Sequence, residues 1–304
     1  KLDNAREKMV NEEENLYKIT SSDISYERRI NLMKVNNNIK AKAMRKLKSI
    51  KNNFQGDNKA QTWLDGLLKI PFGVYRENKI MNFKKDFIEK IKSDNEDIKL
   101  FSHNEIKEYL SNLDETNPLC IEWEKYNKEK AEYLNHVREK LEDAVYGHKE
   151  AKLQLERIFA QWINGESKGA ILGLLGPPGT GKTSLAKNGL SKCLIDNEDE
   201  ARPCAFLPIG GSVNGSTLVG HNYTYVGSTW GRIVEILISC KCMNPIIFID
   251  EIDKISNTEY GREIASILTH LTDSTQNDSF EDKYFSGIPF DLSKALIIFS
   301  FNNL

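Results

Sequence analysis

The chain has 304 residues, of which 39% are hydrophobic and 28% charged, with a formal net charge of −2. This length allows two packed domains, and the small net charge excludes a general electrostatic attraction to nucleic acid or to a membrane surface. No apolar run is long enough to cross a bilayer, and no apolar signal core follows Lys1. The odd number of cysteines, five, argues against a disulfide framework and predicts a reducing compartment: the cytoplasm, or alternatively the mitochondrial matrix or another reducing compartment.

The N-terminal part of the chain is predicted to be helical, because glycine and proline are absent before Gly56. Between Ile30 and Phe54, apolar residues recur every three to four positions, which predicts one long amphipathic helix. Basic residues crowd its other face: Lys40, Lys42, Arg45, Lys46, Lys48 and Lys51. A solvated helix face is the favoured interpretation, and a weak nucleic-acid-binding patch is the alternative. Residues 77–145 are predicted to be charged helices with one break near Pro118.

The C-terminal part alternates predicted strands with predicted helices. The strands are expected at 170–175, 204–209, 246–250 and 295–301, and the helices at 147–163, 182–194, 230–241 and 261–272. This alternation predicts an α/β fold with a doubly wound parallel sheet, preceded by a mainly α-helical N-terminal arm. We expect three ranges: the arm at 1–76, a charged helical insertion or connector at 77–140, and a nucleotide-binding α/β subdomain at 141–304.

A glycine-rich loop lies between the first predicted strand of this part and the helix that follows. Its residues are Gly176, Pro177, Pro178, Gly179, Thr180, Gly181, Lys182 and Thr183, which fit the P-loop pattern G-x-x-x-x-G-K-[ST]. In such a loop the backbone N–H groups cradle phosphates, the lysine contacts the β- and γ-phosphates, and the hydroxyl binds Mg²⁺. A chance glycine-rich turn is the alternative, but the position between strand and helix predicts a site for ATP and Mg²⁺.

Polar residues end two other predicted strands. The strand 246–250 ends in Asp250 and Glu251, at the strand end where ligands bind in parallel sheets. Asp250 is predicted to hold Mg²⁺ and Glu251 to act as the general base on water. The strand 295–301 is followed by Asn302, which could orient that water. Solvated acids and a turn asparagine are the alternatives.

Together these motifs resemble the AAA+ ATPases, and further segments resemble the ATPase module of Lon proteases. The segments are 210–212, 220–221, 224–227, 251–255, 276–277 with Phe280, 282–284 and 289–293, with 63–72 and 145–148 upstream. The resemblance is dense over 141–304, thinner over 25–75 and absent over 77–135.

The resemblance implies roles for individual residues. Tyr146 and Gly147 would flank the adenine, and Asn302 would be the sensor-1 residue. Tyr225 and Val226 would form a pore loop that grips substrate polypeptide, because a rigid aromatic ring beside an aliphatic residue packs on many side chains. A homo-oligomeric ring, a hexamer in this family, is also implied.

Several family elements are not found in these residues: the helical lid with its sensor-2 arginine, the trans-acting arginine finger and the Ser/Lys proteolytic domain. We therefore expect the 304 residues to bind ATP with Mg²⁺ and to hydrolyse it poorly. Two rival hypotheses remain. One is an AAA+ unfoldase or remodeller without proteolytic activity, and the other is a structural or nucleic-acid-binding module built on the basic helix.

Overall fold

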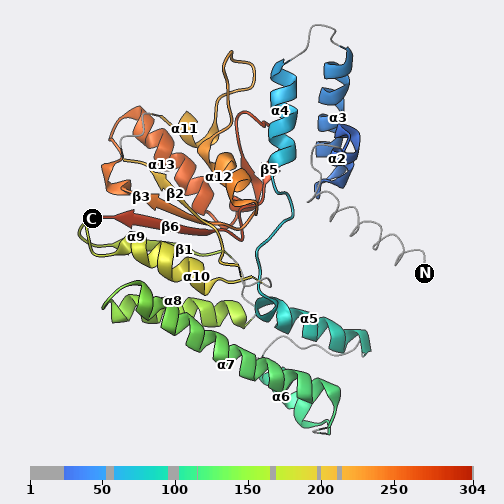
Figure 1. The fold of residues 1–304 in the computed structure, drawn as a ribbon, viewed down its shortest axis with the longest axis vertical. Coiled ribbons are helices and arrows are strands. Elements are labelled where there is room, and N and C mark those ends of the chain that lie inside the picture. The colour runs from blue at the N-terminus through green and yellow to red at the C-terminus, as the bar shows by residue number, and fades with distance from the viewer. Residues whose placement is uncertain are drawn as a thin grey trace. The chain divides into compact units, whose positions relative to one another are not determined.

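The computed structural model describes residues 24–52, 58–94, 103–114, 116–164, 169–196, 200–210 and 214–302 (Figure 1). The chain forms two compact units, each described by itself. The arm unit comprises Lys1–Val74, Val219–Cys242 and Glu281–Phe290, and the sheet unit comprises Tyr75–Leu218, Met243–Phe280 and Asp291–Leu304. The three ranges expected from the sequence stay a prediction. Among the described residues, no helix combines the length and apolarity needed to cross a membrane.

A four-stranded parallel sheet forms the centre of the sheet unit. Its strands are β1 (Ile171–Leu175), β2 (Cys204–Pro208), β3 (Ile246–Asp250) and β6 (Leu296–Phe301), in the order β1-β6-β3-β2. Leu172 of β1 and Phe248 of β3 both lie opposite Ile298 of β6, so the apolar side chains of three strands line up across the sheet. The predicted strands and the predicted parallel α/β fold are confirmed.

The helices of the sheet unit begin and end for local reasons. Helix α8 (Lys149–Ile163) starts two residues later than predicted because Gly147 and His148 both have left-handed backbone angles, with φ of 79° and 52°. The predicted helix 182–194 consists of α9 (Lys182–Ser184), a π-helical turn η1 (Leu185–Leu190) and α10 (Ser191–Cys193). Helix α13 (Glu259–Thr272) begins with a Thr258 cap. Shorter elements elsewhere in the chain are η2 (Ile252–Lys254), η3 (Asn277–Ser279), α11 (Ser216–Val219) and the two-stranded pair β4 (Phe280–Glu281) and β5 (Pro289–Phe290).

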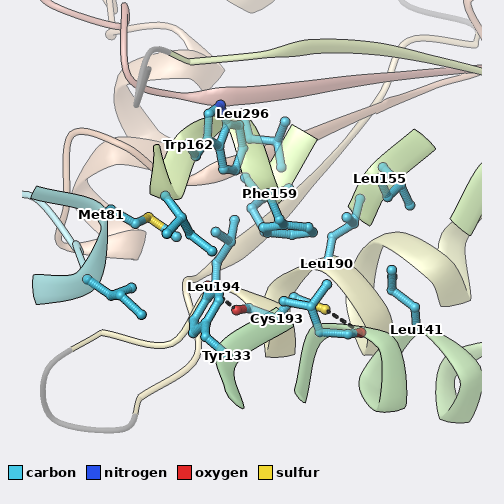
Figure 2. Close-up of a cluster of buried hydrophobic side chains, with 14 of the residues drawn as sticks. Met81, Tyr133, Leu141, Leu155, Phe159, Trp162, Leu190, Cys193, Leu194 and Leu296 are labelled. Carbon is cyan, nitrogen blue, oxygen red and sulfur yellow. Dashed lines mark hydrogen bonds between the residues drawn. The ribbon is translucent and has the colours of Figure 1, made fainter. Parts of the chain in front are cut away.

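The charged segment 77–144 contributes helices to the core of the sheet unit. It forms α5 (Lys79–Asp94), α6 (His103–Ser111) and the 27-residue helix α7 (Pro118–Ala144). Proline at the first position and the Asn117 side chain, which accepts from the Leu119 N–H, start α7. Helix α7 packs against η1 and α8, and its buried side chains join those of one face of the sheet in one apolar cluster (Figure 2).

Two buried hydrogen bonds join α7 to the helix that follows the P-loop. The Tyr133 hydroxyl donates to the carbonyl of Cys193 at 2.6 Å, and the Cys193 thiol donates to the carbonyl of Val137 at 3.6 Å (Figure 2). Burial raises the pKa of the Cys193 thiol to about 12. This cysteine therefore stays protonated at neutral pH and serves packing rather than chemistry.

The arm unit contains α2 (Tyr26–Leu32), α3 (Asn37–Asn52), α4 (Asn58–Lys69) and α12 (Arg232–Cys240). The prediction of one long helix from Ile30 is wrong, because the chain leaves the helical conformation at Met33, with ψ of 132°. A new helix starts where the Asn36 side chain accepts from the N–H of Ile39 at 3.0 Å. Phe54, the predicted end of that helix, lies outside the described residues.

The 220–231 loop of the arm unit is closed at its base by the segment around Asp282. The Gly231 N–H donates to the Asp282 carboxylate at 2.8 Å, and the Lys283 N–H donates to the Val219 carbonyl at 2.7 Å. The Asp282 side chain is fully buried, and this burial raises its carboxyl pKa from 3.8 to about 6, although backbone N–H groups oppose the shift.

We expect Asp282→Asn to flatten the pH dependence of stability. Because the folded-state pKa lies above the unfolded value, the contribution of the protonated group is complete below about pH 4 and is lost as pH rises through about 6. The stability that the wild type loses over this pH range is about 2–3 kcal/mol. Urea unfolding between pH 4.5 and 7.5 measures it, with the exposed Asp278→Asn as control. Equal pH slopes for Asp282→Asn and the wild type would contradict the shift.

Candidate functional site

The P-loop joins the end of β1 to the start of α9 in the sheet unit. Gly179 and Gly181 have φ of 81° and 87°, values that side chains disfavour. A Cβ on Gly181 would also stand 2.6 Å from a methyl group of Val145, so the loop lies directly against the chain before α8. Glycine at 181 is therefore needed both for the turn and for this close approach.

Lys182 lies at the centre of the site. Its ammonium donates to the carbonyls of Gly176 and Pro177 at 2.5 and 3.1 Å, and to the Asn302 side-chain oxygen at 3.0 Å. Lys182 and Asn302 are 120 residues apart in the chain, and they meet because β1 and β6 are neighbouring parallel strands. The structure thus brings two of the predicted site residues into direct contact.

Asp250 is the last residue of β3, which is bordered by β6 and β2, and Glu251 follows it directly. The Asp250 carboxylate accepts from the Glu251 N–H at 3.0 Å. Glu251 has a left-handed backbone with φ of 61°, which costs a residue other than glycine about 1 kcal/mol. Its carboxylate forms an ion pair with Lys254, and this hydrogen bond is the main cause of the raised pKa of Lys254. The predicted base is therefore held in a strained turn and paired with a neighbouring cation.

Two residues without a role in the sequence prediction also support the site. The Asp253 carboxylate accepts from the Asn302 N–H at 3.3 Å, which ties the end of β6 to η2. The His148 ring nitrogen Nε2 lies 2.9 Å from the Thr180 carbonyl, which ties the start of α8 to the P-loop. Single residues such as these have no spacing pattern, and only their proximity to known motifs could have suggested them.

The side chains present fit a nucleotide with a magnesium ion. The Lys182 ammonium rests on loop carbonyls that phosphate oxygens can replace, and Thr183 is exposed beside it. In the described part of the chain, no group of three or more His, Cys, Asp or Glu could hold a metal. The Thr183 hydroxyl and the Asp250 carboxylate suit Mg²⁺, which is held by oxygen ligands, water and substrate phosphates rather than by a protein cage.

The residues predicted to flank the adenine lie beside the P-loop along the chain that enters α8. Tyr146 is 99% exposed, and Gly147 has φ of 79°. An exposed ring next to a left-handed glycine is free to stack on a planar base. The adenine role of both residues stays a prediction.

Tyr225 and Val226 belong to the arm unit and stand at the tip of the 220–231 loop. Their side chains are 62% and 101% exposed. The Tyr225 N–H donates to the Asn222 carbonyl at 3.1 Å, and the Ser228 N–H donates to the Tyr225 carbonyl at 3.3 Å. These bonds form a tight turn that presents an aromatic and an aliphatic side chain to solvent.

Comparisons with known proteins agree with the site. Residues 172–303 match the family described as ATPase family associated with various cellular activities (AAA). The chain is 40% identical over 173 residues to a Lon protease homolog of Acanthamoeba polyphaga mimivirus, which covers 56% of the chain and 16% of that protein. It is 37% identical over 207 residues to the Lon protease of Helicobacter pylori, covering 64% of the chain and 24% of that protein.

A mitochondrial Lon protease homolog of Neurospora crassa is 38% identical over 183 residues, covering 60% of the chain and 16% of that protein. The chain thus spans a quarter or less of the length of these relatives. The matched region contains the P-loop, Asp250, Glu251 and Asn302. Residues 172–303 thus carry an AAA ATPase module, and this part of the chain is similar in sequence to Lon proteases.

Proposed function

We propose that this module binds ATP with Mg²⁺ and is the motor of an ATP-dependent protease that unfolds and pulls polypeptides. The observation that carries the nucleotide site is the contact of the Lys182 ammonium with both the P-loop carbonyls and Asn302. A cation held at the strand ends of a parallel sheet, beside a helix N-terminus, suits a bound triphosphate.

Each residue of the site has a defined task in this proposal. Lys182 leaves the loop carbonyls for the β- and γ-phosphate oxygens, while Thr183 and Asp250 would hold Mg²⁺, which supplies positive charge against the phosphates. Glu251 exchanges its contact with Lys254 for a water molecule, polarises it and takes its proton. Asn302, already beside Lys182, orients the same water.

The exposed tip of the 220–231 loop would contact the substrate. Tyr225 and Val226 have no buried packing role to explain an aromatic and an aliphatic side chain in solvent. In a homo-oligomeric ring, a hexamer by family resemblance, several copies of this tip would line one channel and grip an unfolded chain regardless of its sequence. None of the five cysteines, all within the described residues, forms a disulfide, which suits a reducing compartment.

The proposal is tested by replacing Tyr225. We expect Tyr225→Ala to weaken the ATP-dependent cross-linking of an unfolded polypeptide, such as labelled casein, at least about tenfold, because it removes the aromatic anchor. Tyr225→Phe keeps the ring and should retain most of the signal. The affinity for ATP, measured by titration calorimetry, should not change in either variant. Undiminished cross-linking in Tyr225→Ala would refute the role of the loop.

A further inference from the structure

Two lysines of the N-terminal helices converge on the 220–231 loop. The ammonium of Lys46, on α3, lies 3.8 Å from the ring centroid of Tyr223, and that of Lys59, on α4, lies 4.8 Å from it. Lys59 also donates to the carbonyl of Tyr225 at 2.8 Å. The loop therefore receives one charge-assisted hydrogen bond and two cation–π contacts from helices more than 160 residues away in the chain.

An aromatic cluster holds both stems of the loop against α4. On one stem, Tyr223 makes an edge contact with Tyr284 at 5.6 Å between centroids. On the other stem, Trp230 stacks on Phe285 at 6.0 Å. The indole N–H of Trp63, on α4, donates to the Tyr284 carbonyl at 3.2 Å.

Helix α4 approaches the second stem closely. A Cβ on Gly66 would stand 2.6 Å from the Trp230 ring, so only glycine allows this packing. The stems are thus fixed by packing against the buried Tyr284 and Phe285, and Lys46 holds one stem through Tyr223. Lys59 contacts the same stem residue and also reaches the tip through the Tyr225 carbonyl.

The basic face of α3 has other intramolecular partners as well. Lys40 donates to the Asn31 carbonyl and Lys42 to the Gly287 carbonyl, and Lys51 forms an ion pair with Glu27. With Lys46 on Tyr223, four of the six basic residues of this face contact groups of the arm unit itself. This use of the face favours an internal structural role over the display of positive charge to nucleic acid.

We propose that Lys46 and Lys59 are positioning residues that set the orientation of the Tyr225–Val226 tip. The inference rests on the proposed substrate role of that tip. The turn's own hydrogen bonds run from the Tyr225 N–H to the Asn222 carbonyl, from the Ser228 N–H to the Tyr225 carbonyl and from the Ser228 hydroxyl to the Tyr223 carbonyl. The Tyr225 carbonyl also accepts the bond from Lys59, which ties the tip of the turn to α4. The N-terminal arm thereby becomes part of the substrate-gripping device.

We call the contacts of Lys46 and Lys59 with the 220–231 loop the brace. Hydrogen–deuterium exchange of a peptide covering residues 219–231 tests it. In the double variant Lys46→Met and Lys59→Met, which keeps the aliphatic stems and removes the charges, we expect the exchange rate to rise about tenfold. The double variant Lys46→Arg and Lys59→Arg keeps both positive charges and should show slow exchange like the wild type. Lys48→Met, on the exposed side of α3, is the matched control. The melting temperature should stay within a few degrees of the wild type, because the aromatic packing remains.

Two readouts separate this inference from the proposed function. The double methionine variant should also lose polypeptide cross-linking about tenfold while its ATP affinity stays unchanged. Exchange that is no faster than in Lys48→Met would overturn the brace, even where Tyr225→Ala abolishes cross-linking. A second outcome is faster exchange in the double methionine variant combined with full cross-linking in Tyr225→Ala. The two lysines would then hold the loop in place, but the proposal that they help to grip substrate would be overturned.

Discussion

Replacing Lys182 with alanine is expected to weaken ATP binding at least about hundredfold, because charge-assisted hydrogen bonds to phosphate contribute about 1.5–3 kcal/mol each. The Lys182 ammonium makes three bonds, to the carbonyls of Gly176 and Pro177 and to the Asn302 side chain. Those bonds hold the cation at the mouth of the loop, where the phosphates would lie. Alanine removes the charge and leaves the loop glycines intact, so the measured loss reports on the charge itself.

Titration calorimetry with a non-hydrolysable ATP analogue and Mg²⁺ measures this change. Lys187→Ala is a suitable control, because Lys187 lies on η1 of the same helical segment, 6.0 Å from the Phe206 ring centroid. The control should bind the analogue within about threefold of the wild type, a difference of less than 1 kcal/mol. A Lys182→Ala protein that binds as tightly as the control would remove the basis for the nucleotide site.

The second large effect is expected at Glu251. Glu251→Gln should slow ATP hydrolysis by about 10²–10⁴-fold, the usual contribution of a general base. The amide keeps the shape of the side chain and a hydrogen bond toward Lys254, but it cannot take a proton from water. Glutamine has the same size and shape as glutamate but no negative charge. The affinity for ATP should therefore remain close to that of the wild type.

Single-turnover release of labelled phosphate, with protein in excess over ATP, detects hydrolysis even where the rate is low. Glu259→Gln, at the exposed start of α13, changes an acidic side chain outside the site and should keep the wild-type rate. A Glu251→Gln rate within about threefold of the wild type would show that another group activates the water.

Local patterns in the sequence were sufficient for the sheet and for much of the site. Each strand is a short apolar run, and Gly176–Thr183, Asp250 and Asn302 each follow such a run directly. In a parallel sheet the ends of neighbouring strands lie together, so the contact between Lys182 and Asn302 follows from the order of the elements.

The features that were not predicted depend on contacts that a local pattern does not contain. The apolar period of the first helices continues across Met33 and Val35, but the Asn36 side chain starts a new helix there. The sequence of residues 77–144 indicates charged helices but not what they pack against. The bond from Tyr133 to Cys193, which attaches α7 to the helix after the P-loop, joins residues 60 apart in the chain. The brace from Lys59 to Tyr225 joins residues 166 apart, and no spacing rule connects them.

The attachment of α7 to the helix after the P-loop has a mechanical consequence. With 27 residues, α7 is about 40 Å long, and its C-terminal half is fixed to η1 and α10 through Tyr133, Val137 and Leu141. Its N-terminal third is joined to α8 by the bond from the Tyr126 hydroxyl to the Ile163 carbonyl. A rotation of only about 5° at the phosphate-binding helix would therefore swing the Pro118 end through about 3 Å. Helix α7, carrying α8 with it, would thus act as a lever that enlarges a small rotation beside the P-loop into a larger displacement of its Pro118 end.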